Sequence, residues 1–290
     1  MIPRKFEYLA PTTIAQAVSY LRKYRDAKIL SGGMSLIPMM KLRLVSPKYV
    51  IDINNIKGLD YIKDGGKVVR IGALVRHADI EHSQIIKKRL PILAEAAPQI
   101  ADMQVRNLGT FLGSLAHADP AADWPAPVLA LDAELVAQGT AKRRIKAVKF
   151  FKGPFETALK PTEILVEAII PVPQGPKVGQ AYLKFERKAG DFATVGVATS
   201  IVLNEKNEFE KVGIGLTAVA PAPFRATDAE KILLGQKPSK ELIEEAAKAA
   251  AAMSDPTSDL RGSAEYKREM ARVFTRRSLN KALERAGVAV

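Results

Sequence analysis

The sequence predicts an α+β fold in which two small α/β units precede a C-terminal domain of antiparallel strands and helices. Three observations predict this class. Helical periodicity alternates with short apolar runs in the first half of the chain, a proline-rich segment interrupts the sequence at residues 171–176, and strand-like runs followed by helix-like runs come after it. We therefore expect domains at 1–175 and 176–290, with the first divided at about residue 56.

The first unit starts with an amphipathic helix. Thr13 forms a capping-box pattern with the glutamine three residues on, and apolar residues follow at helical spacing. Next come a short apolar strand at 27–30, a glycine-containing turn at 31–35, and a helix-like segment that carries Pro38 in its first turn. A strand at 49–53 completes this unit.

The second unit is expected to begin with a strand at 68–74, followed by one or two helices over 77–97 that are broken at the proline in their second half. Residues 134–137 and 144–151 flank a Gly-Thr pair and have the pattern of a hairpin. A further strand at 163–170 ends at the proline-rich segment.

The C-terminal domain is expected to contain three antiparallel strands and two helices. The strands are predicted at 179–186, 194–203 and 211–219. The helices are predicted at 240–253, which is rich in alanine, and at 263–286, which carries its large apolar residues on one face.

Composition excludes several kinds of chemistry. With 290 residues, of which 47% are hydrophobic and 26% charged, the chain can bury a substantial core. No run approaches the roughly 18 apolar residues of a membrane span, and the start of the chain passes directly into polar sequence, so we expect a cytoplasmic protein. The absence of cysteine excludes disulfides, cysteine-ligated iron–sulfur clusters and a cysteine nucleophile.

Metal and nucleic-acid sites are also not expected. His77 and His82 would point roughly 140° apart on a helix, which does not suit a shared metal ion. The net charge of +13 could indicate nucleic-acid binding. However, the one dense basic run, 142–146, lies in a predicted hairpin strand, where lysines discourage aggregation, and aromatic residues are not interleaved with basic ones. The surplus charge could instead contact acidic partner subunits.

Two glycine-containing segments could bind a phosphate group. Residues 31–35 read Ser-Gly-Gly-Met-Ser after a strand, and residues 109–114 read Gly-Thr-Phe-Leu-Gly-Ser in the second unit. Successive backbone N–H groups in such turns, or at a helix N-terminus, form concavities that suit a pyrophosphate. A tight connection between a strand and a helix explains either segment without a ligand. No Gly-x-Gly-x-x-Gly pattern follows a strand and no P-loop occurs, so a Rossmann site and a P-loop hydrolase are disfavoured.

Polar residues cluster directly after the second segment. Residues 116–125 contain two carboxylates, a histidine and the only tryptophan of the chain. Functional residues concentrate on loops of this kind. Alternatively, Asp119 starts a turn before its proline and Trp124 fills the core.

These segments together resemble the FAD-binding medium subunits of the xanthine oxidase and carbon monoxide dehydrogenase family of molybdenum hydroxylases. The resemblance rests on residues 29–36 (Ile-Leu-Ser-Gly-Gly-Met-Ser-Leu), residues 107–114 (Asn-Leu-Gly-Thr-Phe-Leu-Gly-Ser), and the Ala-Asp-Pro-x-x-Asp pattern ending at Asp123. It continues through blocks at 163–165, 184–193 and 259–266 in the same order, and so covers nearly the whole chain.

The resemblance implies a two-part FAD-binding domain of the vanillyl-alcohol-oxidase type, with FAD between its parts, followed by a small domain of three antiparallel strands and helices. Residues 31–36, Thr110, Gly113 and Ser114 would line the pyrophosphate, Asp123 would accept hydrogen bonds from cofactor hydroxyls, and Leu165 and Lys184 would approach the flavin. No catalytic residue and no metal ligand is expected. The expected cofactor-binding residues are Ser31, Gly32, Gly33, Met34, Ser35, Leu36, Gly109, Thr110, Gly113, Ser114, Asp123, Leu165 and Lys184.

Two positions depart from the family pattern. The second segment usually reads Thr-Ile-Gly-Gly, whereas Leu112 stands here in place of the first glycine of that pair. The first segment often carries a histidine where this chain has Met34. With Met34 and no cysteine, noncovalent FAD is expected.

The implied function is electron transfer. The chain would pass electrons from [2Fe-2S] clusters on a small partner subunit through FAD to an external acceptor, while a large partner subunit with the molybdenum cofactor oxidises the substrate. The resemblance implies a dimer of heterotrimers. An archaeal-type aldehyde or glyceraldehyde oxidoreductase is the preferred subgroup, with carbon monoxide dehydrogenase and other hydroxylases as competitors. The alternatives are a self-sufficient FAD-dependent oxidase or reductase, such as a UDP-sugar reductase or an alcohol oxidase, and a nucleic-acid-binding module.

Overall fold

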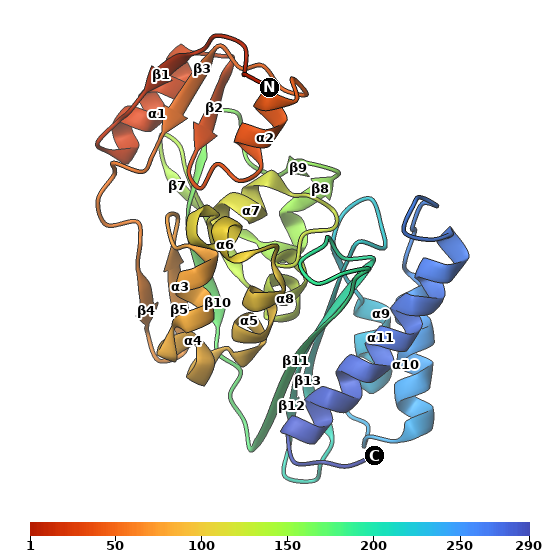
Figure 1. Cartoon of the computed structure of the whole chain (residues 1–290). Coiled ribbons are helices and arrows are strands. Elements are labelled where there is room, and N and C mark those ends of the chain that lie inside the picture. Colours follow the sequence, from red (N-terminus) through yellow and green to blue (C-terminus); the bar gives the residue numbers. More distant parts are fainter.

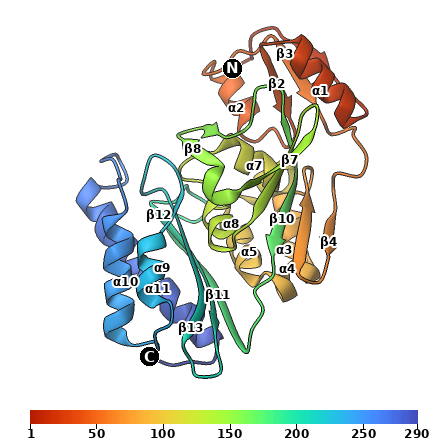
Figure 2. The same ribbon diagram turned by 180° about the vertical axis from the view of Figure 1, so that it is seen from behind.

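The computed structural model describes residues 1–290, which form three stacked parts (Figure 1). A small N-terminal unit lies at one end, a second α/β unit lies in the middle, and the C-terminal domain packs against the side of the middle unit. The view from behind shows the N-terminal sheet above the long strand β10 of the middle unit (Figure 2). The predicted α+β class is confirmed. No helix is long and apolar enough to cross a membrane.

The N-terminal unit contains a parallel sheet of three strands in the order β1-β3-β2. Its first helix begins as the sequence predicts, because the Thr13 hydroxyl accepts a hydrogen bond from Gln16 N at 3.2 Å. Ala17, Val18 and Leu21 of this helix are buried against the sheet. The elements are β1 (Glu7–Leu9), α1 (Ile14–Lys23), β2 (Ala27–Leu30), α2 (Leu36–Lys41) and β3 (Tyr49–Asp52).

The middle unit contains an antiparallel sheet of five strands in the order β4-β5-β10-β6-β7. The strands are β4 (Ile62–Asp64), β5 (Val68–Gly72), β6 (Glu134–Gln138), β7 (Lys142–Lys146) and β10 (Ile164–Pro171). The predicted hairpin strand 144–151 is wrong in its bounds: β7 ends at Lys146, and a 3-10 turn at Ala147–Lys149 leads into a small separate hairpin of β8 (Phe151–Gly153) and β9 (Glu156–Thr157).

Six short helices belong to this unit. The predicted helical stretch 77–97 contains three of them, because Ser83 ends one helix and caps the next, and Leu90 leaves the helical conformation (φ −137°, ψ 60°) before Pro91. The helices are α3 (His77–His82), α4 (Gln84–Arg89), α5 (Pro91–Ala96), α6 (Met103–Leu108), α7 (Phe111–His117) and α8 (Pro125–Ala130).

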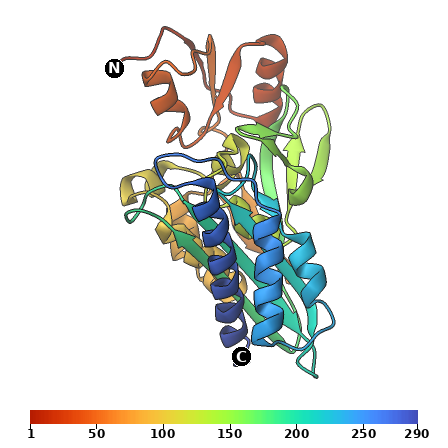
Figure 3. The ribbon, with the colours of Figure 1, turned by 90° about the vertical axis from the view of Figure 1, so that its right-hand side faces the viewer.

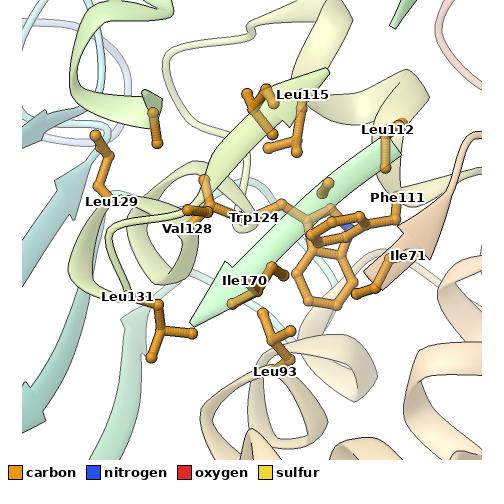
Figure 4. Packing of buried hydrophobic residues seen from close by; sticks show 14 of the residues in the cluster. Ile71, Leu93, Phe111, Leu112, Leu115, Trp124, Val128, Leu129, Leu131 and Ile170 are labelled. Carbon is orange, nitrogen blue, oxygen red and sulfur yellow. The ribbon is translucent and has the colours of Figure 1, made fainter. Parts of the chain in front are cut away.

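Trp124 is at the centre of the largest hydrophobic cluster. It is fully buried, and its ring meets the edge of Phe111 at a centroid distance of 4.9 Å. Figure 4 shows Trp124 and Phe111 together, with Leu112 and Ile71 beside them. The tryptophan therefore does fill core, and it also fixes the start of α7 against the five-stranded sheet.

The C-terminal domain contains an antiparallel sheet in the order β11-β12-β13-β14. Every residue of β12 is buried, because α10 and α11 cover one face of the sheet and α5 and α8 of the middle unit contact the other. Figure 3 shows α10 and α11 running side by side across the first face. The strands are β11 (Lys177–Phe185), β12 (Val195–Leu203), β13 (Phe209–Thr217) and β14 (Phe224–Arg225), and the helices are α9 (Thr227–Leu233), α10 (Lys240–Ala252) and α11 (Ala264–Arg285).

The three predicted strands and two predicted helices are present, but β14 and α9 were not predicted. β14 contains only two residues, too few for an alternating pattern, and α9 begins without a side-chain cap. Residues 172–176 connect the sheet of the middle unit to that of the C-terminal domain. The domain limits at 175 and 176 remain a prediction.

Candidate functional site

A large cavity lies between the N-terminal and middle units. Its volume is about 670 Å³, which is within the range of roughly 300–1,000 Å³ for ligand pockets. Residues 190–192 of the C-terminal domain close part of its wall, and most of the lining residues are apolar. All the expected cofactor residues line it except Lys184: Ser31, Gly32, Gly33, Met34, Ser35, Leu36, Gly109, Thr110, Gly113, Ser114, Asp123 and Leu165.

The first segment, between β2 and α2, presents unpaired donors. None of the five backbone N–H groups from Gly32 to Leu36 donates a hydrogen bond within the protein. Gly33 has a φ of +75°, a conformation that favours glycine and lets the chain turn into α2. Such a row of N–H groups attracts an anionic ligand, because the partial positive charges of successive N–H groups point toward one concavity.

The second segment lies between α6 and α7, and most of it forms the first turn of α7. Thr110 is the N-cap of α7, and its hydroxyl accepts a hydrogen bond from Gly113 N at 3.2 Å. Only the N–H groups of Thr110 and Leu112 remain unpaired in this turn. The Leu112 side chain is 1% exposed and packs into the core (Figure 4), so it leaves its own N–H free beside the cavity.

The two segments touch each other. The hydroxyls of Ser31 and Thr110 are 2.9 Å apart and share a hydrogen bond. A Cβ at Gly32 would lie only 2.5 Å from Leu108 O and 2.8 Å from Thr110 N, so only glycine permits this approach. The family resemblance predicted that both segments bind the same ligand, and the structure brings the two segments into contact.

Asn54 and Arg76 connect the same two segments and were missed from the sequence. Asn54 Nδ2 donates to Ser31 O at 2.9 Å, and Arg76 Nη2 donates to Asn54 Oδ1 at 2.8 Å. Arg76 Nη1 also donates to Leu108 O. Asn54 stands beside a second asparagine and Arg76 follows an apolar run, and no spacing or motif indicated this role.

Asp123 lines the cavity and belongs to a buried polar cluster. Its Oδ1 accepts a hydrogen bond from the Tyr182 hydroxyl at 2.6 Å, and Lys184 Nζ lies 3.2 Å from each carboxylate oxygen. Burial raises the pKa of Asp123 to about 6, although the Lys184 ammonium and the Tyr182 hydroxyl favour the ionised form. Burial also raises the pKa of Tyr182 well above its ordinary value, so the tyrosine remains a donor.

Lys184 lies behind Asp123 rather than on the cavity wall. Its side chain has no exposed surface, and Nζ also donates to Gln99 O at 2.8 Å and lies 3.1 Å from a Glu186 carboxylate oxygen. Two carboxylates therefore neutralise the ammonium group. Leu165, by contrast, lines the cavity from β10 and offers an apolar surface for a planar ring.

Fold and cavity together define a protein that binds an extended nucleotide cofactor. The backbone donors suit a pyrophosphate, the apolar wall suits rings, and Asp123 offers acceptor oxygens for hydroxyl groups. No group of three or more metal-ligating side chains occurs.

Comparisons with known proteins agree with this class. The family model described as "FAD binding domain in molybdopterin dehydrogenase" matches residues 4–173, and "CO dehydrogenase flavoprotein C-terminal domain" matches residues 180–282. The chain is 44% identical to the carbon monoxide dehydrogenase medium chain of Hydrogenophaga pseudoflava over 288 residues, 98% of this chain and 99% of the relative. It is 39% identical to the glyceraldehyde dehydrogenase medium chain of Sulfolobus acidocaldarius over 276 residues, 95% of this chain and 97% of the relative.

Solved structures are similar over the same length. A chain of the Hydrogenophaga pseudoflava carbon monoxide dehydrogenase that lacks the Mo-pyranopterin moiety matches with a TM-score of 0.96, covering 99% of this chain and 100% of that chain at 44% identity. A chain of quinoline 2-oxidoreductase from Pseudomonas putida 86 matches with a TM-score of 0.92, covering 99% of each at 31% identity.

The chain therefore belongs to the family of FAD-binding medium subunits of molybdenum hydroxylases, which are oxidoreductases. The resemblance seen in the sequence is confirmed. The cavity fits FAD on three independent features of this chain: the unpaired N–H row, the close approach that only Gly32 permits, and the buried carboxylate.

Proposed function

We propose that this chain binds FAD noncovalently in the cavity and serves as the electron-transfer subunit of its complex. The observation that carries the proposal is the row of unpaired N–H groups from Gly32 to Leu36, fixed beside the Thr110 turn. When bound, FAD supplies a carrier that can accept electrons from iron–sulfur clusters and release them to an external acceptor.

Residues 31–36 and the turn from Gly109 to Ser114 would bind the pyrophosphate. Their backbone donors are already oriented, since the Ser31–Thr110 hydrogen bond and the contacts of Asn54 and Arg76 fix one segment relative to the other. Little conformational entropy is then lost when the anion binds. Met34 offers no nucleophile for a covalent bond, which supports noncovalent binding.

Asp123 would accept hydrogen bonds from hydroxyl groups of the cofactor, and Leu165 would pack against its ring. Lys184 supports this arrangement indirectly: its ammonium group keeps the Asp123 carboxylate oriented, together with the Tyr182 hydroxyl. Both of these supporting residues belong to β11, so the C-terminal domain contributes to the cofactor site.

The partners in this proposal are a large subunit with the molybdenum cofactor and a small subunit with [2Fe-2S] clusters, assembled as a dimer of heterotrimers. The similar relatives are named for carbon monoxide and glyceraldehyde, and the similar solved chain for quinoline, although each matches nearly the whole chain. This variety supports a division of labour in which another subunit selects the substrate. An aldehyde remains our preferred substrate class.

Flavin absorbance of the purified chain tests the proposal. Aldehydes, purines and carbon monoxide should leave the FAD of the isolated chain oxidised, whereas dithionite should reduce it. Adding the iron–sulfur and molybdenum subunits should restore reduction by substrate. Turnover of an organic substrate by the chain alone would instead identify a self-sufficient flavoenzyme.

A further inference from the structure

His77 is a buried histidine, and one of its ring nitrogens already accepts a hydrogen bond within the protein. It is the first residue of α3, it is 5% exposed, and it lines the cavity. Its Nδ1 accepts a hydrogen bond from Trp124 Nε1 at 2.9 Å. Because an indole N–H can only donate, Nδ1 carries no proton, and the neutral ring must carry its proton on Nε2.

The Nε2–H group has no acceptor within the protein. No hydrogen bond from Nε2 to a protein atom is present, and the His77 side chain lines the cavity. Burial, with smaller effects of Arg106 and Arg76, lowers the pKa of His77 to about 4. The ring therefore presents the same uncharged donor throughout the physiological pH range.

The position of the ring is fixed by the second cofactor segment. His77 N donates to Gly109 O at 3.0 Å, and a Cβ at Gly109 would lie 2.7 Å from His77 Nε2. Glycine at position 109 thus makes room for the histidine. A ring held by its backbone, by an indole and by a glycine contact is a preorganised donor.

We propose that His77 binds the cofactor directly, by donating a hydrogen bond from Nε2 to an acceptor atom of FAD, and that Trp124 is the positioning residue that sets its tautomer. This inference rests on the proposed binding of FAD in the cavity. Its acceptor is either a phosphate oxygen or an atom of the flavin ring, which share the same chemistry toward an N–H donor.

Affinity measurements test the proposal with a matched pair of variants. His77→Leu removes both ring nitrogens at similar volume, and we expect FAD to bind roughly 5- to 10-fold more weakly, as for loss of one hydrogen bond. His77→Gln can still accept from Trp124 and donate to the cavity, so it should recover part of the affinity. His82→Leu, at the other end of the same helix and outside the cavity lining, should bind FAD like the wild type.

Ligand fragments locate the acceptor. Weaker binding of ADP by His77→Leu assigns it to the pyrophosphate, and weaker binding of riboflavin assigns it to the ring; either result supports the proposal. If His77→Leu binds FAD, ADP and riboflavin with wild-type affinity, His77 is not a ligand. If the wild-type chain itself does not bind FAD, the proposed function fails instead.

Nitrogen-15 NMR of the wild-type chain gives a test that does not depend on a stable variant. The chain has three histidines, so their ring signals can be assigned by single substitutions. We expect His77 to be protonated on Nε2 before and after FAD is added, with a shift of that signal on binding, and Trp124→Phe should allow the other tautomer. A proton on Nδ1, or an unchanged Nε2 signal in the FAD-saturated protein, would overturn the proposal.

Discussion

Replacing Gly32 with alanine should separate the two cofactor segments. The added Cβ would lie 2.5 Å from Leu108 O, 2.6 Å from Gly109 Cα and 2.8 Å from Thr110 N. An ordinary contact needs about 3.5 Å, so the second segment must move by roughly 1 Å. All three contacts are with backbone, which cannot rotate away as a flexible side chain can. The hydrogen bond between Ser31 and Thr110, now 2.9 Å long, would then exceed hydrogen-bonding distance.

The magnitude follows from these displacements. Overpacking of this kind costs about 1–3 kcal/mol in the free energy of unfolding. Loss of one hydrogen bond to a charged group costs about 1.5–3 kcal/mol, which is roughly 10- to 150-fold in the dissociation constant of FAD. FAD affinity should therefore fall in addition to the stability of the FAD-free chain, because the donors on both segments lose their common orientation.

The assay is a fluorescence titration of the FAD-free chain with FAD, combined with urea unfolding in its absence. Gly58→Ala is the matched control: Gly58 has a φ of +78° but no atom within 4 Å of its added Cβ. We expect it to lose about 1–2 kcal/mol of stability from backbone strain alone and to bind FAD normally. Wild-type FAD affinity in Gly32→Ala would refute the reasoning about the paired segments.

Three further predictions concern side chains around the cavity. Asp123→Ala should weaken FAD binding by about 1–3 kcal/mol, with nearly normal electron transfer in the FAD that remains; full occupancy without turnover would point to a catalytic carboxylate. The pKa of Asp123 is raised to about 6, so its ionised form is lost below that pH. FAD affinity of the wild type should therefore fall between pH 7 and pH 5, whereas that of Asp123→Asn should stay level. FAD titrations across this pH range check both expectations. Leu112→Gly restores the family residue and removes a core side chain, so it should lower the free energy of unfolding by about 2–5 kcal/mol. FAD affinity of the folded variant should stay unchanged. Weaker FAD binding would mean that the Leu112 side chain orders the turn.

A stability measurement checks the state of His77. The pKa of His77 is lowered to about 4 in the folded protein, below the ordinary value of 6.5. As the pH falls, the histidine is therefore protonated in the unfolded chain before it is protonated in the folded one. The free energy of unfolding should decrease as the pH falls from 6.5 to 4. The shift corresponds to about 3 kcal/mol. Asp123 has a raised pKa and opposes this loss in part of the same range, so Asp123→Asn should be compared with the double variant that also carries His77→Gln. Equal pH dependence of the two would contradict a buried neutral histidine.

The elements with strong local signals were predictable from the sequence. The Thr13 cap and the long strands of the C-terminal sheet each carry a pattern that local structure alone explains. The glycines of both cofactor segments were also found, because few residue types allow those turns. Their meeting could be inferred only through the family resemblance.

The parts that escaped prediction depend on tertiary contacts. Asn54, Arg76 and Tyr182 act on residues far away in the chain, and nothing near them in the sequence indicates their partners. Because tryptophan is large and apolar, Trp124 could be assigned to the core from the sequence. Its hydrogen bond to His77 could be seen only in the structure. The placement of Lys184 behind Asp123 likewise follows from the packing of β11 against the middle unit.

The FAD content of the purified chain tests the central claim most directly. The chain should show the absorbance of an oxidised flavin, and acid or heat should release one FAD per chain into the supernatant. This result is expected because the N–H row from Gly32 to Leu36 has no acceptor within the protein, the first segment carries Met34, and the chain has no cysteine. A colourless chain that does not take up added FAD would contradict the account.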